Sequence, residues 1–338
     1  MAGANTIYFN EMRTPLLALL ALLSVAADRT ERQTSVPRLW NGLVQGRSDV
    51  GFRHLEGRTQ VDVWYPAADI GTRMVYRDYV GDAATGLESF LTGTGISKAT
   101  VDSLLNSPLM AMAAGPPRTG SFPLVLLSHG NRQSAADQAV LGEFLASHGF
   151  VVASTPSPML RTPMEPQSQI AQFAEEQAED LVTAVSVVAS AIPVDTSRLF
   201  LVSHSFGARS ALLMAMRNPR VRALVSLDGG IGTATGIEEL RAAPSFRADV
   251  RLPPILHVYE ELDEFMKPDL AFLRSLRADT LVLERLQAMH HVHFTTYGFA
   301  AAAFPEIAQV TGATTATSFE VRNTVARVLD FIQSRSKP

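Results

Sequence analysis

The sequence contains no cysteine. Disulfide bonds and lipid attachment at a cysteine are therefore excluded, and the fold has to be stabilised by its hydrophobic core. The chain also lacks an excess of basic residues, because its formal net charge is −4 at pH 7. This balance argues against nucleic acid as a partner. Hydrophobic residues make up 46% of the 338 positions, which suits one large domain or two small ones.

A long apolar run that could anchor the chain in a membrane is absent as well. Arg13 precedes a short apolar run at residues 16–23, and small residues follow it up to Ala27. A basic residue, a short apolar run and a small-residue cleavage site are typical of a secretory signal peptide, although a buried N-terminal helix is the alternative. We therefore predict a signal peptide at 1–27, a linker at 28–49, and a secreted or periplasmic domain at 50–338.

The chain is organised around residues 203–207, which are Ser-His-Ser-Phe-Gly. The apolar run at 199–202 predicts a buried strand before them, and good helix formers predict a helix after them. A strand and a helix joined by a sharp turn with serine at its apex form a nucleophile elbow, which needs small residues two positions before and after the serine. Ser203 and Gly207 meet that need, so Ser205 is the candidate nucleophile.

Strand and helix signals alternate along most of the chain, without a repeat or a linker beyond residue 50. This alternation predicts an α/β fold with one doubly wound, mostly parallel sheet, in which functional groups gather at the carboxyl ends of the strands. The first predicted strand ends in aromatic residues and proline, and we expect it to be antiparallel at the edge of the sheet. The predicted strands are 59–66, 122–127, 150–154, 199–202, 221–228, 254–259 and 280–286, and the main predicted helices are 136–148, 173–190, 208–216 and 317–334.

Residues 77–120 lack strand signals and contain two short helical stretches, one around Phe90 and one around Leu104. We predict a small helical insertion here. Such an insertion could act as a lid over a site and line an apolar pocket, or it could pack as a satellite at the edge of the domain. The sequence leaves both interpretations open.

A serine nucleophile needs a base to accept its proton and a carboxylate to orient that base. Two carboxylates follow strands that come after the nucleophile in the chain. Asp228 ends the strand directly after the elbow helix, and Asp263 follows the next strand. We favour Asp228 as the acid and keep Asp263 as the alternative, since both preserve the order serine, acid, histidine.

Three histidines lie close together after the last strand, at His290, His291 and His293. Each is a candidate base, and their spacing does not separate them. Two histidines two positions apart could also ligate zinc, but no carboxylate-rich motif accompanies them. We therefore expect no metal site.

A developing oxyanion needs two backbone N–H donors aimed at it. We expect one from Phe206, directly after the nucleophile, and the other from Asn131, in the loop after the strand at 122–127. His204 and His129 lie beside these positions, and we predict structural roles for both.

Four stretches together resemble one branch of a known superfamily. They are Phe122-Pro123 through Ser128-His129-Gly130, then 145–152, then Val63-Trp64-Tyr65-Pro66, and the elbow. They resemble the platelet-activating-factor acetylhydrolase-like branch of the α/β-hydrolases, near the dienelactone hydrolases and the bacterial cutinase-type polyesterases. The resemblance spans about residues 50–300. Ser203 departs from the pattern, which has glycine at the first position of the elbow.

The resemblance implies an α/β-hydrolase fold with Ser205 as nucleophile, Asp228 as acid and His291 as base. The base follows from the family's His-x-x-Phe pattern, which is matched at residues 291–294. It also implies the amides of Asn131 and Phe206 as oxyanion donors.

The neighbouring histidines leave His293 and then His290 as alternative bases, and the cutinase-type branch keeps Asp263 as the alternative acid. We expect an exported serine hydrolase that cleaves carboxylic esters, either short-acyl lipids or small esters, without a cofactor. The alternatives are a cutinase-like polyesterase and a non-catalytic protein of the same fold that binds a lipid or a partner.

Overall fold

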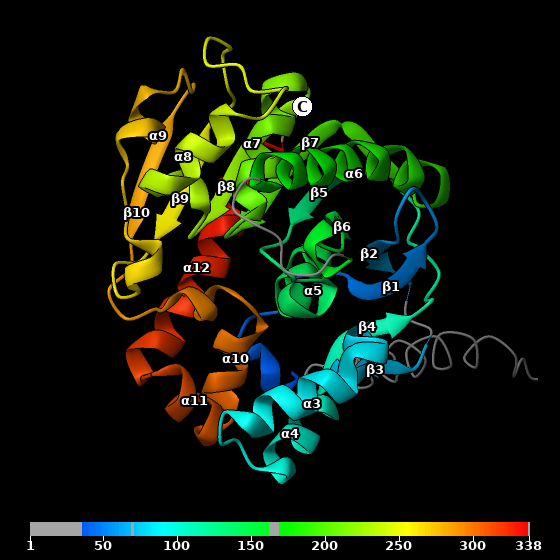
Figure 1. The fold of residues 1–338 in the computed structure, drawn as a ribbon. Helices are drawn as coiled ribbons and strands as arrows, with labels where there is room; N and C mark the ends of the chain where they lie inside the picture. The colour runs from blue at the N-terminus through cyan, green and yellow to red at the C-terminus, as the bar shows by residue number, and fades with distance from the viewer. Residues whose placement is uncertain (1–35, 69–70, 162–168, 337–338) are drawn as a thin grey trace, which may run out of the picture. The chain divides into compact units, whose positions relative to one another are not determined.

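The structure is a computed structural model that describes residues 36–68, 71–161 and 169–336 (Figure 1). Pro37–Pro338 form one folded unit. The predicted signal peptide and the first part of the predicted linker lie outside the described residues. Within the described ranges, no helix is long and apolar enough to cross a bilayer.

The described strands form one ten-stranded sheet in the order β10-β9-β8-β7-β5-β6-β2-β1-β4-β3. The six strands from β10 to β6 are all parallel, whereas β2 is antiparallel to both of its neighbours. The mostly parallel, doubly wound sheet predicted from the sequence is therefore confirmed. The strands are β1 Asp49–Leu55, β2 Val61–Ala67, β3 Arg73–Val75, β4 Pro108–Ala113, β5 Phe122–Ser128, β6 Val151–Thr155, β7 Val194–His204, β8 Val221–Leu227, β9 Ile255–Tyr259 and β10 Leu281–Arg285.

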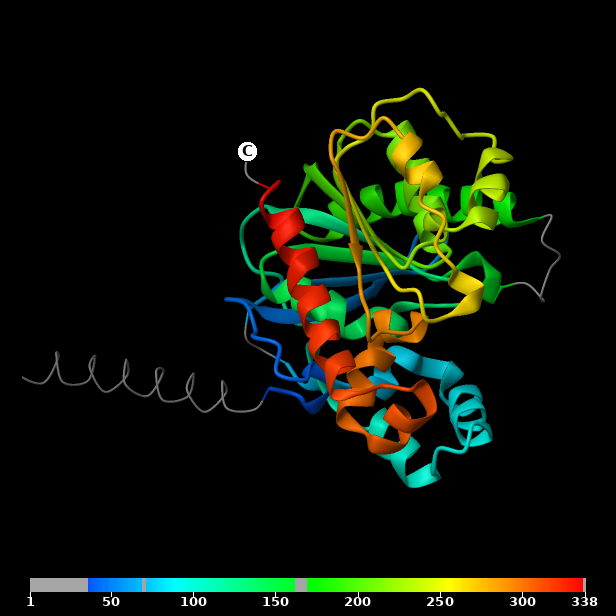
Figure 2. The same cartoon turned by 90° about the vertical axis from the view of Figure 1, so that its left-hand side faces the viewer.

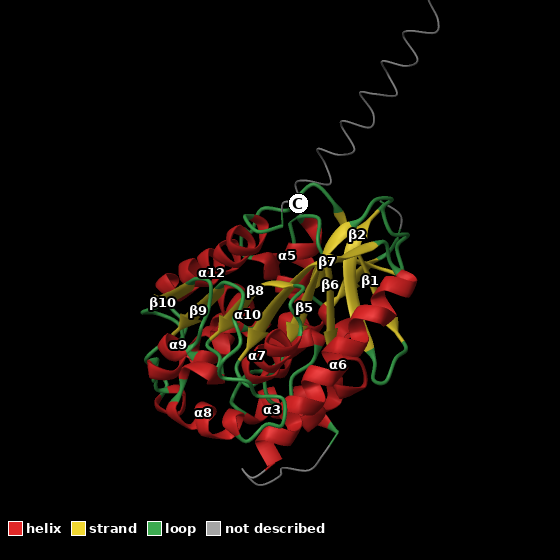
Figure 3. Cartoon of the chain, turned by 90° about the horizontal axis from the view of Figure 1, so that it is seen from above, coloured by secondary structure: helices red, strands yellow, loops and turns green. Residues whose placement is uncertain are grey.

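Helices cover both faces of this sheet. The helices are α2 Tyr76–Val80, α3 Ala84–Gly93, α4 Lys98–Leu105, α5 Ala139–Ser147, α6 Ile170–Ala191, α7 Gly207–Arg217, α8 Ala234–Arg241, α9 Ala271–Ser275, α10 Thr296–Ala303, α11 Pro305–Thr311 and α12 Thr315–Gln333. Short 3-10 turns are η1 Arg38–Trp40, η2 Gly81–Ala83, η3 Ala135–Gln138, η4 Pro158–Leu160, η6 Gly230–Gly232, η7 Glu264–Met266 and η8 His291–Phe294. Helices α5, α10 and α12 lie on one face, and α12 runs along it in red (Figure 2). Helices α6, α7, α8 and α9 lie on the other (Figure 3).

The two faces of the sheet carry separate hydrophobic cores, and the central strand β5 contributes to both. Val125 and Leu127 point into the core under α5 and α12, while Leu124 and Leu126 point into the core under α6 and α7. All four are buried. A parallel strand that is buried on both faces has no polar alternation, which explains why this stretch is a continuous apolar run.

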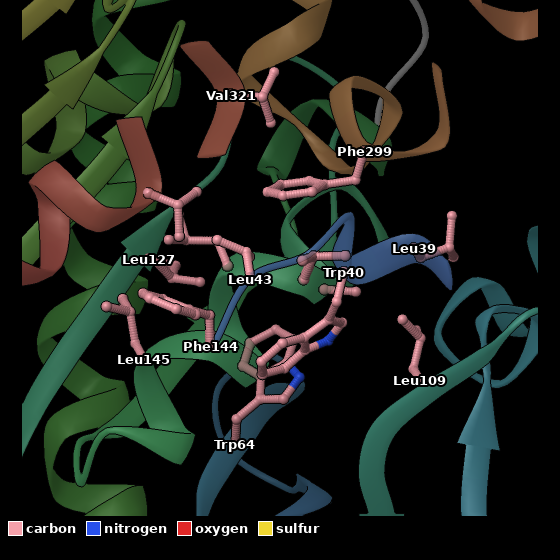
Figure 4. Close-up of a cluster of buried hydrophobic side chains, with 14 of the residues drawn as sticks. Leu39, Trp40, Leu43, Trp64, Leu109, Leu127, Phe144, Leu145, Phe299 and Val321 are labelled. Carbon is pink, nitrogen blue, oxygen red and sulfur yellow. The ribbon is translucent and has the colours of Figure 1, made fainter. Parts of the chain in front are cut away.

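The predicted linker at 28–49 is wrong for the part that the structure describes. Leu39 and Trp40 in η1 are fully buried, and Trp40 packs beside Trp64 and Phe144 in the core (Figure 4). The Trp40 indole N–H also donates to the buried Glu143 carboxylate at 2.9 Å. Folded structure therefore begins before residue 50, because one aromatic side chain anchors a segment whose composition is otherwise polar.

The N-terminal side of the sheet extends further than predicted. Strand β2 is antiparallel as expected, but it is not an edge strand, since β1, β4 and β3 lie beyond it. Strand β4 falls inside residues 77–120, where no strand was expected. Its residues are mainly methionine, alanine and leucine, so β-branched side chains give no signal there. The helical part of the insertion is present as α3 and α4, and the Glu306 carboxylate of α11 binds the start of α4 through Ser97 and Thr100.

Candidate active site

Ser205 stands at the sharp turn between β7 and α7. Its φ is +54°, in the left-handed region that costs a non-glycine residue about 1–2 kcal/mol. Two backbone hydrogen bonds hold this conformation: the Ser205 N–H donates to Leu227 O at 3.2 Å, and the Gly230 N–H donates to Ser205 O at 2.9 Å. Strain that the surroundings maintain is a feature of functional sites, and here it exposes the hydroxyl at the end of the sheet.

Small residues on both sides allow the turn. A Cβ added at Gly207 would lie 2.2 Å from the Ser128 carbonyl oxygen, so α7 can begin at this position only with glycine. On the other side, Ser203 has its hydroxyl donating to the Val225 carbonyl at 2.8 Å, in the neighbouring strand. This bond explains how serine is accepted at the elbow position where the resembled family has glycine, since the buried hydroxyl has a partner.

A continuous chain of hydrogen bonds links Ser205, His291 and Asp228. The Nε2 atom of His291 lies 2.9 Å from Ser205 Oγ, and its Nδ1 atom lies 2.5 Å from Asp228 Oδ2. A carboxylate accepts only, so the Nδ1–H donates to Asp228 and the Nε2 lone pair faces the serine hydroxyl. In this tautomer the imidazole can take a proton from Ser205.

Asp228 is held in the same fixed way as the serine. It is 2% exposed, and its φ is +42° at the end of β8. Its N–H donates to Val258 O at 2.7 Å, and its Oδ1 accepts the Glu260 N–H at 3.2 Å. One carboxylate oxygen is therefore occupied by a backbone amide, which leaves the other for His291.

The two other histidines of the cluster do not reach the serine. His290 has its Nδ1 atom 2.8 Å from Asp263 Oδ1, and the buried His293 accepts the His290 N–H at its own Nδ1 at 2.9 Å. Burial lowers the pKa of His293 to about 4, so its ring is neutral near pH 7. Of the three histidines, all of which the structure describes, His291 alone has its ring within hydrogen-bond distance of Ser205.

Asp263, the alternative acid, faces the backbone of the histidine turn and not the ring of His291. Its Oδ2 atom accepts the His291 N–H at 2.7 Å. Within the described residues, no group of three or more His, Asp or Glu side chains could hold a metal ion.

The two amides that we expect to stabilise an oxyanion flank the serine. Phe206 precedes the first residue of α7, and a Cβ added at Gly130 would lie 2.9 Å from Ser205 Cβ, which brings the loop of Asn131 against the nucleophile. Among the described residues, neither the Phe206 N–H nor the Asn131 N–H donates to another protein group. Both amides can therefore bind an oxygen of a substrate.

Gln133 holds this loop, and no sequence signal pointed to it. Its Oε1 atom accepts the Gly130 N–H at 2.8 Å and lies 2.9 Å from His204 Nδ1. The His204 ring lies against the ring of His291, tilted by 30°, with 4.7 Å between centroids. Burial, followed by the neighbouring histidine, lowers the pKa of His204 well below its usual value, so it supports the site as a neutral ring. His129 is also fully buried, and burial lowers its pKa to about 4.

Three apolar side chains stand exposed in the segments that follow β6 and β9, and we call Leu160, Leu262 and Phe265 the apolar rim. They are 43%, 48% and 72% exposed. The Phe265 ring lies edge-on to His291 with 5.3 Å between centroids. Sequence reasoning missed this set, because isolated apolar residues in loops carry no periodic signal.

The parallel, doubly wound sheet with a left-handed serine between strand and helix defines the class of proteins with the α/β-hydrolase fold. A ferulic acid esterase from Streptomyces cinnamoneus has a similar structure, with a TM-score of 0.61 and 20% identity over 86% of this chain and 92% of that chain. At this level of identity the likeness concerns the fold alone. The model of the chlorophyllase family matches residues 90–245.

Curated relatives agree with this class. Cutinase 1 of Thermobifida cellulosilytica is 33% identical over 112 residues, which are 33% of this chain and 41% of the relative. Chlorophyllase type 0 of Chenopodium album is 25% identical over 132 residues, 38% of each chain. The chain thus spans less than half the length of these curated relatives. It belongs to the α/β-hydrolase superfamily.

Proposed function

We propose that this protein is a serine hydrolase that cleaves carboxylic esters, with Ser205 as nucleophile, His291 as base and Asp228 as acid. The single observation that supports this most is the hydrogen-bond chain, 2.9 Å from Ser205 Oγ to His291 Nε2 and 2.5 Å from His291 Nδ1 to Asp228 Oδ2. Cutinases and a chlorophyllase among the relatives add support for ester chemistry.

The reaction follows from the geometry in two halves. The Ser205 oxygen attacks the ester carbonyl while His291 takes the serine proton, and Asp228 stabilises the imidazolium. The amides of Phe206 and Asn131 donate to the oxyanion. The alcohol leaves with the proton from His291, and an acyl-serine remains. Water then attacks this ester, again with His291 as base, and releases the carboxylic acid. Each proton is carried by protein groups or water, so the proposed reaction uses no cofactor.

The apolar rim supports a substrate with an apolar acyl or alcohol group. Leu160, Leu262 and Phe265 expose carbon surface that a polar substrate would leave in water, and Phe265 adjoins the His291 ring. A short-acyl lipid or a small ester fits this surface. The second candidate is a polyester, which the cutinase relatives favour, because a polymer segment could lie along an exposed rim.

A binding protein without activity is the rival from another class. Hydrolysis of p-nitrophenyl esters from acetate to palmitate separates the two, when wild type is compared with Ser205→Ala and labelling with a fluorophosphonate probe is measured in parallel. We expect turnover and labelling that are both lost in the variant, and the preferred chain length measures the acyl site. Equal turnover in the variant, or none in the wild type, would contradict the proposal.

Export through an N-terminal signal peptide belongs to the same proposal. The apolar run at residues 16–23, preceded by Arg13 and followed by small residues, supports it. N-terminal sequencing of protein recovered outside the cytoplasm should give Asp28 as the first residue. A cytoplasmic protein that keeps residues 1–27 would contradict it.

A further inference from the structure

The carboxylate of Asp263 binds the turn that carries His291, from outside the chain of Ser205, His291 and Asp228. Its Oδ2 atom accepts the His291 N–H at 2.7 Å, and its Oδ1 atom lies 2.8 Å from His290 Nδ1. Asp228 binds the His291 ring, whereas Asp263 binds the His291 backbone. Two carboxylates from two successive strand ends therefore hold one histidine at two different places.

Asp263 is itself oriented by a buried carboxylate. The Asp263 N–H donates to the Glu260 carboxylate, at 3.0 Å to Oε2 and 3.3 Å to Oε1. Glu260 is fully buried, and its own N–H donates to Asp228 Oδ1 at 3.2 Å. The same short segment after β9 therefore connects Asp228, which binds the ring, with Asp263, which binds the backbone.

The histidine turn needs such support because it is short. Turn η8 contains only His291–Phe294, and a single helical turn is unstable without outside contacts. Its first N–H groups have no backbone partner within the turn, so side chains have to bind them. The His290 N–H is bound by the His293 ring from inside the protein, and the His291 N–H is bound by Asp263.

We propose that Asp263 is a positioning residue, which fixes the backbone of His291 so that the imidazole reaches Ser205 and Asp228 at the same time. This inference rests on the proposed function. Asp263 makes no hydrogen bond with the His291 ring, so it acts through the placement of that ring. A catalytic group misplaced by about 1 Å loses up to roughly 100-fold in rate, which sets the scale of the effect.

The first test compares Asp263→Ala with Glu261→Ala. Glu261 lies on the same loop, but its carboxylate pairs with Arg285 on the surface, 2.9 Å away, so it serves as the matched control. With p-nitrophenyl butyrate, we expect kcat to fall roughly 10- to 100-fold in Asp263→Ala with KM little changed. Asp263→Asn keeps one acceptor oxygen and should lie between that variant and the wild type. Glu261→Ala should stay within about twofold of the wild type.

The second test asks whether Asp263 acts through His291 alone. In a His291→Ala background the residual hydrolysis no longer depends on the ring, so adding Asp263→Ala should cause no further loss. All variants are compared below their unfolding transitions, which thermal melts define. A residue that acts on the site other than through the His291 ring would lower the residual rate by the same factor in both backgrounds.

The outcomes separate this inference from the proposed function. If the wild type turns over esters and Ser205 is labelled, but Asp263→Ala matches Glu261→Ala, then the positioning role is overturned and the enzyme remains. An equal loss in the two backgrounds also overturns the positioning role. If the wild type neither turns over esters nor labels at Ser205, then the proposed function fails and the positioning role fails with it.

Discussion

Replacing Asp228 by asparagine disturbs the hydrogen-bond chain in a way that the structure defines. The oxygen at Oδ1 already accepts the Glu260 N–H, so an asparagine that keeps this bond must turn its NH2 group toward His291 Nδ1. An NH2 group donates only, and the imidazole would then have to carry its proton on Nε2, facing Ser205. In that tautomer His291 cannot accept the serine proton.

The opposite orientation of the asparagine keeps the correct tautomer but leaves the buried Glu260 N–H without an acceptor. That loss costs about 1–3 kcal/mol, and the missing charge on the bond to the imidazolium costs about 1.5–3 kcal/mol more. Together these terms give roughly a 10²- to 10⁴-fold loss, at 1.36 kcal/mol for each factor of ten.

The assay for Asp228→Asn is kcat with p-nitrophenyl butyrate at pH 8, with a thermal melt as the control for folding. We expect a loss in the stated range with KM little changed. A folded variant within tenfold of the wild type would refute the reasoning. If Asp263→Asn then lost more than Asp228→Asn, the two aspartates would have the opposite roles.

Three further predictions concern residues in the core and at the rim. Glu143 is fully buried and accepts hydrogen bonds from Trp40, Tyr79 and the amides of Met110 and Ala111. Glu143→Leu should therefore lower the free energy of unfolding, measured with urea, by at least about 3 kcal/mol. Glu88→Ala, which removes one side of an exposed ion pair, should lower it far less. An unchanged midpoint would contradict this. Burial lowers the pKa of His257 from 6.5 to about 3, so the unfolded state binds the extra proton as the pH falls below 6.5 and stability is lost. His257→Asn should therefore lose about 2 kcal/mol less than the wild type between pH 7 and pH 5, and parallel curves would show otherwise. Phe265→Ala should lower kcat/KM for p-nitrophenyl octanoate roughly 3- to 10-fold and leave kcat/KM for the acetate ester nearly unchanged. Phe319 is exposed on α12, and Phe319→Ala should change kcat/KM for neither ester. An equal loss on both esters would remove Phe265 from the substrate surface.

The elbow and the central strands could be predicted because their signals are local. Strand β5 is buried on both faces and is therefore apolar at consecutive positions, and the elbow combines such a strand with small residues around Ser205. Strand β4 could not be predicted in this way. Its backbone amides at Met110 and Ala111 are bound by the Glu143 carboxylate from α5. Glu143 lies 33 residues after Met110 and 32 residues after Ala111 in the sequence. No property of the β4 sequence encodes that partner.

The candidate site could likewise be predicted only in part from the sequence. The sequence brought forward two aspartates and three histidines, but their arrangement depends on contacts across the fold. The His291 ring meets Ser205 across 86 residues, and Asp263 meets the histidine turn across 27 and 28 residues. Only the comparison with a family pattern favoured His291 beforehand, since spacing treats neighbouring histidines alike. Residues such as Gln133 and Glu260 had no motif at all.

The burial of Trp40 against Glu143 has a consequence for the order in which the chain folds. The two residues are 103 positions apart, so the segment around Trp40 completes its contacts only after α5 has been synthesised. Contacts of such long range form slowly because the loop between them must close first. In a chain exported as proposed, this delay would keep the part next to the leader unfolded, and therefore able to pass through a translocation channel, until the rest of the domain has been synthesised.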